Sequence, residues 1–277
     1  MKNIKHFILA ILLSVGFAKS IHAQIYVGAG AGYGLPAMNE MIGSNSVETE
    51  TTDTEEGVYS SFGKGILPGL YVGYMFNENW GAELGFGMLM GQEVTITFSE
   101  TNPTTNVTSN ATETYKGKMM RITPGIRYYA GSDNLRPYLR MGFVIGVGGK
   151  LEYTYHKVTT NPSQTNTYDD AWEFSGAPAF GFSSGLGIQY MFSDKFGVFG
   201  EVGAIFQKWA PAKAMATKSM VDGQDQLPGM NVADKQIEFF DEYTSTSQQD
   251  PNQPSPEIRR YYPFSSWGIN AGVHLKF

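Results

Sequence analysis

The sequence contains no cysteine, so a disulfide framework and thiol chemistry are excluded. Lys and Arg total 20 against 26 Asp and Glu, and this acidic balance argues against a nucleic-acid partner. After the N-terminal segment, no stretch approaches the run of about 20 apolar residues that a transmembrane helix needs. Mean hydropathy is slightly negative. Transmembrane β-barrels show this value because lipid-facing residues alternate with polar lumen residues.

Residues 1–23 have the composition of a secretory signal peptide. Lys2 and Lys5 precede an apolar run over 7–17, which is too short to cross a bilayer as an anchor helix. Ala23 offers a cleavage site before Gln24. We therefore expect one mature domain over 24–277. The full chain has a formal net charge of −6, and the mature domain, without the three lysines of the signal, has −9.

The segment 267–277 alternates strictly between apolar and other residues. Ile269, Ala271, Val273, Leu275 and Phe277 share one face, which predicts a strand with one apolar face. Seven further segments have strand character, and the eight candidates are 24–34, 63–76, 80–98, 113–129, 137–157, 172–192, 196–210 and 257–277.

The connections between these segments alternate in length. Those over 77–79, 130–136 and 193–195 are short, whereas those over 35–62, 99–112, 158–171 and 211–256 are long. Transmembrane barrels have short periplasmic turns and long outer loops. The sequence therefore predicts an all-β, eight-stranded antiparallel up-and-down transmembrane β-barrel, with both mature termini in the periplasm. Several strands exceed the 9–11 residues that a bilayer needs, so we expect them to extend above the outer surface as a sheet.

The predicted lipid face is apolar, and it ends in aromatic residues near the short turns. In 80–88, for example, Trp80, Leu84 and Phe86 share a face without charge. Amphipathic rings prefer the headgroup layer, so we expect an aromatic girdle there. Its predicted members are Phe76, Trp80, Tyr128, Tyr129, Tyr138, Phe192, Phe196 and Phe277.

The opposite face collects the ionisable residues at bilayer depth, which are costly unless they are paired. They are Glu83, Arg121, Arg127, Arg140, Glu201, His274 and Lys276. We expect Arg127 to reach Glu83 or the neighbourhood of Arg140, and Glu201 to meet Lys276 or His274. One interpretation is a lumen filled by its own side chains. The alternative is a narrow channel for ions or small apolar solutes.

Two predicted loops are candidates for an extracellular partner. Loop 35–62 carries six acids and no base, and loop 211–256 is the longest and contains several prolines. Binding often lies on loops held by a rigid frame, but a solvated variable surface explains the same composition. Enzymatic chemistry has little support, because His156 with Ser163, Ser175 or Asp169 has no triad-like spacing. A lipid A-modifying hydrolase is the enzymatic alternative, and no metal or cofactor motif is present.

The alternating strand that ends at Phe277, the segment Pro-Gly-Ile-Arg-Tyr-Tyr over 124–129 and Gly-Leu-Gly-Ile-Gln-Tyr-Met-Phe over 185–192 resemble small outer-membrane β-barrels. The resemblance is to the OmpA-like, OmpX-like and OmpW-like porin-family barrels of Gram-negative bacteria, and the tyrosine-rich strands look like Bacteroidetes proteins.

This resemblance implies a non-enzymatic integral outer-membrane protein with a structural or surface-interaction role. Its implied partners are outer-membrane lipid, lipopolysaccharide and, during assembly, the barrel insertion machinery. That machinery would recognise the last strand through Trp267, Val273, Leu275 and Phe277.

Overall fold

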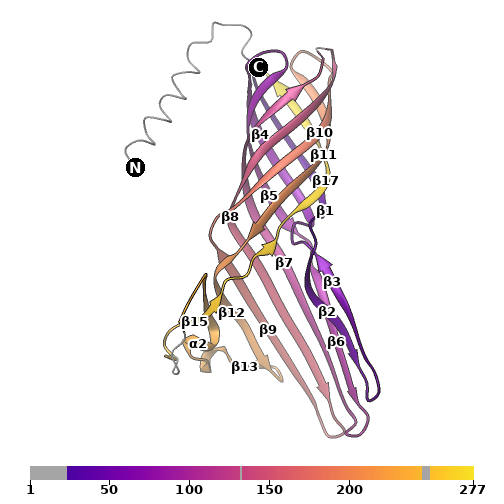
Figure 1. The fold of residues 1–277 in the computed structure, drawn as a ribbon, viewed down its shortest axis with the longest axis vertical. Coiled ribbons are helices and arrows are strands. Elements are labelled where there is room, and N and C mark those ends of the chain that lie inside the picture. The colour runs from indigo at the N-terminus through magenta and orange to yellow at the C-terminus, as the bar shows by residue number, and fades with distance from the viewer. Residues whose placement is uncertain (1–23, 132, 245–249) are drawn as a thin grey trace.

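Eight antiparallel strands close into a barrel in the computed structural model, which describes residues 24–131, 133–244 and 250–277 (Figure 1). The predicted fold class is confirmed, while the signal predicted over 1–23 lies outside the described residues. In order around the ring, the strands are β1 (Gln24–Pro36), β4 (Gly65–Met75), β5 (Trp80–Gly91), β7 (Val107–Tyr129), β8 (Leu135–Thr160), β10 (Ala179–Met191), β11 (Phe196–Trp209) and β17 (Ser266–Lys276).

The first and last strands complete the ring. β1 pairs with β17, where Ala29 lies opposite Val273, and with β4 on its other side, where Ala29 lies opposite Leu70. Hydrocarbon offers no hydrogen bonds, so an open strand edge would leave backbone N–H and C=O groups without partners. The closed ring gives each of these eight strands a neighbour on both sides.

The three short connections lie at one end of the barrel, together with Gln24 and Phe277, and we call this the terminal end (Figure 1). Local side chains stabilise these turns. Asn77 Oδ1 accepts hydrogen bonds from the backbone N–H groups of Asn79 and Trp80, at 2.9 and 2.8 Å. Ser193 Oγ accepts one from the N–H of Phe196 at 3.1 Å. Asx and Ser side chains commonly close turns in this way.

At the opposite end, strands continue beyond the barrel as a second structure, which we call the distal sheet (Figure 1). The distal parts of β7 and β8 form its centre. The order across it is β3 (Asp53–Ser60), β2 (Glu40–Glu48), β6 (Val94–Asn102), β7, β8, β9 (Thr165–Gly176), β12 (Pro211–Val221), β14 (Gln236–Phe240) and β15 (Ser255–Ile258). The expectation that long strands extend beyond the barrel is confirmed.

Short elements complete the described chain. They are β13 (Gln224–Asp225), the 3₁₀ helix η2 (Leu227–Gly229), α2 (Val232–Lys235) and β16 (Tyr262–Pro263). In the described part of the chain, no helix has both the length and the apolar character that crossing a membrane requires. Two of the strand pairings in the distal sheet are parallel, β2 with β6 and β14 with β15.

Three of the four predicted long loops are largely strand, so that part of the prediction is wrong. Segment 35–62 holds the hairpin of β2 and β3, and 99–112 and 158–171 hold the ends of two hairpins closed at 103–106 and 161–164. Both faces of the distal sheet are partly exposed, so these strands lack the apolar alternation that identifies a half-buried strand. Their threonines, valines and tyrosines still favour extended backbone.

Strand boundaries also differ from the prediction at the places where the polypeptide passes from the barrel to the distal sheet. The segment 80–98 is two strands, β5 and β6, separated at 92–93, and 172–192 is β9 and β10, separated at 177–178. The strand predicted to end at 210 continues as β12, so part of loop 211–256 is ordered sheet. Each break occurs where a strand leaves the barrel and joins the distal sheet (Figure 1).

Candidate functional site: the barrel lumen

Two arginines and two glutamates form a paired layer across the lumen. Arg127 Nη2 lies 2.7 Å from Glu83 Oε2, and both side chains are almost fully buried. Arg140 makes a two-point contact with Glu201, Nη2 to Oε1 at 2.7 Å and Nε to Oε2 at 3.1 Å. Arg140 Nη1 is also 4.0 Å from Glu83 Oε1. The four residues, which we call the charge layer, balance one another in charge.

Strand register and one glycine bring the Arg140–Glu201 pair together. Arg140 on β8 lies opposite Gly185 on β10, and Glu201 lies on β11, the next strand. A Cβ atom at Gly185 would be 2.6 Å from the carboxyl carbon of Glu201. The missing side chain therefore leaves the space in which the two groups meet across β10. The expectation that Glu201 meets Lys276 or His274 is wrong, because Glu201 lies level with Asn270 instead.

Tyrosine rings surround Arg127 on the side of the charge layer that faces the terminal end. The guanidinium carbon is 4.5 Å from the ring centre of Tyr138 and 4.6 Å from that of Tyr71. Its Nη1 donates to Tyr129 Oη at 3.2 Å, and Tyr26 Oη donates to Glu83 at 3.3 Å. These contacts help to stabilise the buried charge. With Met75 and Phe199, these four tyrosines form one buried cluster, the tyrosine layer.

The placement of Tyr129 and Tyr138 in the outer aromatic girdle is wrong. Their exposed fractions are 2% and 3%, because each follows an outward neighbour and so points into the lumen. Tyr128 points outward, is half-buried and packs on Trp80 with ring centres 4.8 Å apart. The other predicted girdle residues, Phe76, Trp80, Phe192, Phe196 and Phe277, are exposed on the outside near the terminal end.

His274 and Lys276 lie nearer the terminal end than the charge layer. Tyr71 Oη and His274 Nδ1 are 3.1 Å apart, and the His274 ring is 5.0 Å from that of Tyr26. Both basic residues line an open cavity of about 530 Å³ at the terminal end, with Arg136 and Gln189 also in its wall. This vestibule ends against the tyrosine layer, since Tyr26 and Tyr129 also line it.

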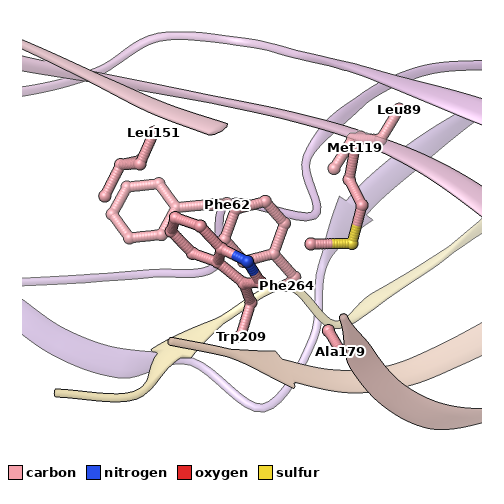
Figure 2. Packing of buried hydrophobic residues seen from close by; sticks show 7 residues of the cluster. All are labelled: Phe62, Leu89, Met119, Leu151, Ala179, Trp209 and Phe264. Carbon is pink, nitrogen blue, oxygen red and sulfur yellow. The ribbon is translucent and has the colours of Figure 1, made fainter. Parts of the chain in front are cut away.

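At the distal end, a cluster of buried apolar side chains fills the barrel mouth, and we call it the distal plug (Figure 2). Its members come from five consecutive strands of the ring, β5, β7, β8, β10 and β11, and from two segments that turn inward before β4 and β17. They are Phe62, Leu89, Met119, Leu151, Ala179, Trp209 and Phe264. The rings of Trp209 and Phe264 pack edge to face with centres 5.6 Å apart. The plug therefore separates the polar lumen from the distal sheet.

The inward segments 61–64 and 263–265 are held together by backbone-directed hydrogen bonds. Ser61 Oγ donates to the carbonyl oxygens of Ser265 and Pro263, at 2.6 and 3.1 Å, and the N–H of Phe62 donates to Pro263 at 2.8 Å. A Cβ atom at Gly63 would lie 2.4 Å from the Ser265 carbonyl oxygen, so this close approach requires glycine. The plug was not predicted from the sequence, although the aromatic residue next to Gly63 and the one after Pro263 were possible signals.

Arg121 is separate from the charge layer and contacts the plug. Its Nε donates to Gln207 Oε1 at 3.0 Å, and its Nη2 donates to the Phe264 carbonyl oxygen at 2.9 Å. In the described chain, its Nη1 has no hydrogen-bond partner, although the residue is buried. Arg121 therefore fixes one of the two inward segments rather than neutralising a carboxylate.

Residues outside the lumen are placed as follows. Trp267, Val273, Leu275 and Phe277 all point outward and are exposed. On the distal sheet, His156 Nδ1 lies 2.7 Å from Asp169 Oδ1, and Lys218 Nζ lies 3.6 Å from Asp169 Oδ2. The hydrogen bond to His156 holds the pKa of the Asp169 carboxyl below its ordinary value. In the described structure neither Ser163 nor Ser175 is hydrogen-bonded to His156, whose partner is the Asp169 carboxylate rather than a nucleophile.

Known proteins were compared with the chain by sequence and by structure. The solved structure of the outer membrane protein OprG from Pseudomonas aeruginosa is 11% identical, with a TM-score of 0.42, covering 92% of this chain and 96% of that one. A search of curated proteins found no match. The family model of the outer membrane protein beta-barrel domain matches residues 7–208, which is more than half of the chain. With a closed eight-stranded barrel, an apolar outside and a paired polar lumen, the chain belongs to the outer-membrane protein β-barrel domain family.

Proposed function

We propose that this outer-membrane barrel is a non-conducting, non-enzymatic anchor that displays the distal sheet at the cell surface. The observation that carries the proposal is the double obstruction of the lumen. The charge layer and tyrosine layer fill its middle, and the distal plug fills its mouth. A cavity of only about 130 Å³ remains beside the charge layer, against about 530 Å³ in the vestibule. Side chains fill eight-stranded barrels in general.

Orientation follows from the two unlike ends. Outer-membrane barrels have short periplasmic turns and longer extracellular segments. We infer that the terminal end faces the periplasm and that the distal sheet faces outward. Residues 1–23, as a signal that is removed, would account for export. We also propose that the barrel is of the OmpA-like kind and of the Bacteroidetes type, as the resemblance in its sequence implies.

Assembly and surroundings complete the proposal. The outward residues Trp267, Val273, Leu275 and Phe277 on and after β17 would contact the barrel insertion machinery, and then outer-membrane lipid. Lipopolysaccharide would surround the outer part of the barrel. No cofactor or metal enters the proposed function, and the surface segments within 35–62 and 211–256 are the predicted contact regions for an extracellular partner.

Conductance of the purified protein in planar lipid bilayers tests the closed lumen. We expect no reproducible steps from the parent and none from Trp209→Ala/Phe264→Ala, because the loss of two plug rings leaves the charge layer and the tyrosine layer across the lumen. Phe143→Ala is the matched control, because Phe143 is 70% exposed on the lipid side. Steps from the parent that disappear when Glu83 or Arg127 is replaced would favour the narrow channel instead.

Cysteine labelling of intact cells tests the orientation. The chain contains no cysteine, so one introduced thiol gives an unambiguous signal. Thr105→Cys lies in the turn between β6 and β7, and Asp194→Cys in the turn between β10 and β11 at the terminal end. We expect a membrane-impermeant maleimide to label the first in intact cells and the second only after the outer membrane is permeabilised. The reverse pattern would refute surface display.

A further inference from the structure

The two faces of the distal sheet differ in how their charges are matched. Side chains alternate between faces along a strand, and residues opposite each other on antiparallel strands share a face. Leu151 belongs to the distal plug, so the alternate residues Tyr153, Tyr155 and Lys157 lie on the face that continues the lumen. We call this the inner face and the opposite side the outer face.

The outer face pairs its acids with bases on neighbouring strands. Lys118 Nζ is 2.5 Å from Glu152, and Lys150 Nζ is 2.7 Å from Glu173. Further pairs on this face are Lys116 with Glu93, His156 with Asp169, Lys218 with Asp169 and Lys213 with Glu238. This face therefore needs no partner to balance its charges.

The inner face carries acids without matching bases. Glu113 on β7 and Asp170 on β9 both lie opposite Tyr155 on β8, so the two carboxylates flank one ring, roughly 10 Å apart at the usual strand spacing. Glu48 and Glu100 lie opposite each other on β2 and β6. In the described chain, none of these four carboxylates is within ion-pair distance of a basic side chain.

Aromatic rings accompany these acids on the inner face. In the adjacent row, Tyr115, Tyr153 and Trp172 lie side by side on β7, β8 and β9. The rings of Tyr115 and Tyr153 are 4.9 Å apart, and Tyr115 Oη donates to Glu113 at 3.0 Å. Burial, with Glu113 and Asp170 nearby, holds the pKa of Tyr155 above its ordinary value, so the ring is neutral at physiological pH. Neutral aromatic faces beside carboxylates favour cations.

The inner face is shaped as a shallow surface rather than a closed pocket. Glu48, Glu100, Glu113, Tyr155 and Lys157 are among the residues that line a hollow of about 330 Å³. From β3 to β9 the sheet is six strands wide, or roughly 24 Å at about 4.8 Å between strands. Charges spread over this width match several cations on one polymer better than one small ion.

We propose that the inner face of the distal sheet binds a lysine- or arginine-rich polypeptide segment, with one cationic side chain over Tyr155 between Glu113 and Asp170. The inference deepens the proposed surface-interaction role and rests on the outward display of the sheet. Charge complementarity selects the occupant, because Glu48, Glu100, Glu113 and Asp170 lack a basic partner on the described inner face, and Lys157 is the base that lies in the rows between them.

Binding of fluorescent oligo-lysine to the purified full-length protein in nonionic detergent, followed by fluorescence anisotropy, tests the proposal. We expect saturable binding that weakens with added salt, and no binding of oligo-glutamate. Glu113→Gln/Asp170→Asn should weaken the affinity for oligo-lysine about tenfold. This is the effect of losing two partly exposed ion pairs that contribute about 0.7 kcal/mol each. The matched control, Glu152→Gln/Glu173→Gln, makes the same charge change on the outer face and should alter affinity less than about twofold. Circular dichroism verifies folding, and Glu100→Gln is a second inner-face variant that leaves the Tyr115–Glu113 bond intact.

Three results would overturn the proposal: no binding of oligo-lysine by the parent, equal weakening by the inner and outer variants, or displacement of oligo-lysine by a neutral oligosaccharide. The detergent assay measures the face itself, whichever side of the membrane it occupies. Its failure would leave surface labelling at Thr105 unchanged, while failed labelling would leave peptide binding intact. The two failures are therefore distinguishable.

Discussion

Replacing Glu83 by glutamine would remove one carboxylate from the charge layer with little change of shape. Arg127 would lose its partner at 2.7 Å while remaining almost fully buried. Removing one member of a buried ion pair costs about 3–5 kcal/mol, because the other charge is left uncompensated. The tyrosine rings at 4.5 and 4.6 Å and the bond to Tyr129 remain. We therefore expect a loss at the lower end, about 3 kcal/mol of unfolding free energy.

A double-mutant cycle makes the attribution specific. Arg127→Met removes the other charge, so Glu83→Gln/Arg127→Met should be more stable than Glu83→Gln alone, while Arg140 keeps Glu201. The exposed control is Glu93→Gln, which breaks the 3.1 Å ion pair between Glu93 and Lys116. The Lys116 side chain is 39% exposed and the Glu93 side chain is 59% exposed. Exposed pairs contribute about 0–1 kcal/mol.

Denaturant unfolding in lipid vesicles, monitored by tryptophan fluorescence, measures these differences. Equal losses for Glu83→Gln and Glu93→Gln would mean that water screens the charge layer as well as it screens the surface. That result would contradict both the buried-pair argument and the closed lumen, since a well-hydrated layer is compatible with an ion path.

Three further predictions concern the close backbone contacts, the distal tyrosines and His156. Gly91→Ala should destabilise the barrel by about 1–3 kcal/mol, because its Cβ would lie 2.1 Å from the Gly117 carbonyl oxygen, whereas Gly200→Ala, with nothing within 4 Å, should be close to neutral in the same unfolding assay. Burial and Glu113 raise the pKa of Tyr115, Tyr153 and Tyr155, so the folded sheet keeps these protons at a pH where the unfolded chain loses them, and its stability falls as pH rises above about 10. Glu113→Gln should lower these pKa values and shift the rise of tyrosinate absorbance to lower pH. An unchanged titration curve would contradict the role of Glu113. His156→Ala should leave the lipid A profile of the producing strain unchanged, since His156 pairs with Asp169, and an altered profile in mass spectrometry would restore the enzymatic alternative.

Much of the barrel could be predicted from the sequence because lipid imposes a simple rule on each strand. An apolar residue at every second position fixes which side chains face outward, and Glu83, Arg127 and Arg140 necessarily face the lumen. Short turns with Asn77 and Ser193 fix the hairpins at the terminal end. Segments beyond the membrane are not subject to this alternation, so their structure could not be predicted in the same way. Segment 35–62, for example, was predicted as a loop and contains a hairpin.

The strand alternation, the inward charges and the apolar outside follow from the amino-acid order alone, because they depend only on neighbours along the chain and on the solvent around them. Which of the inward charges form pairs depends on how the strands are arranged in three dimensions, and the folded barrel settles it. Strand register and the missing side chain of Gly185 place Glu201 against Arg140 rather than against Lys276. It also decided that Phe62 and Phe264, distant in sequence, close the barrel mouth together. Such contacts join strands through barrel tilt and closure, which no single segment specifies.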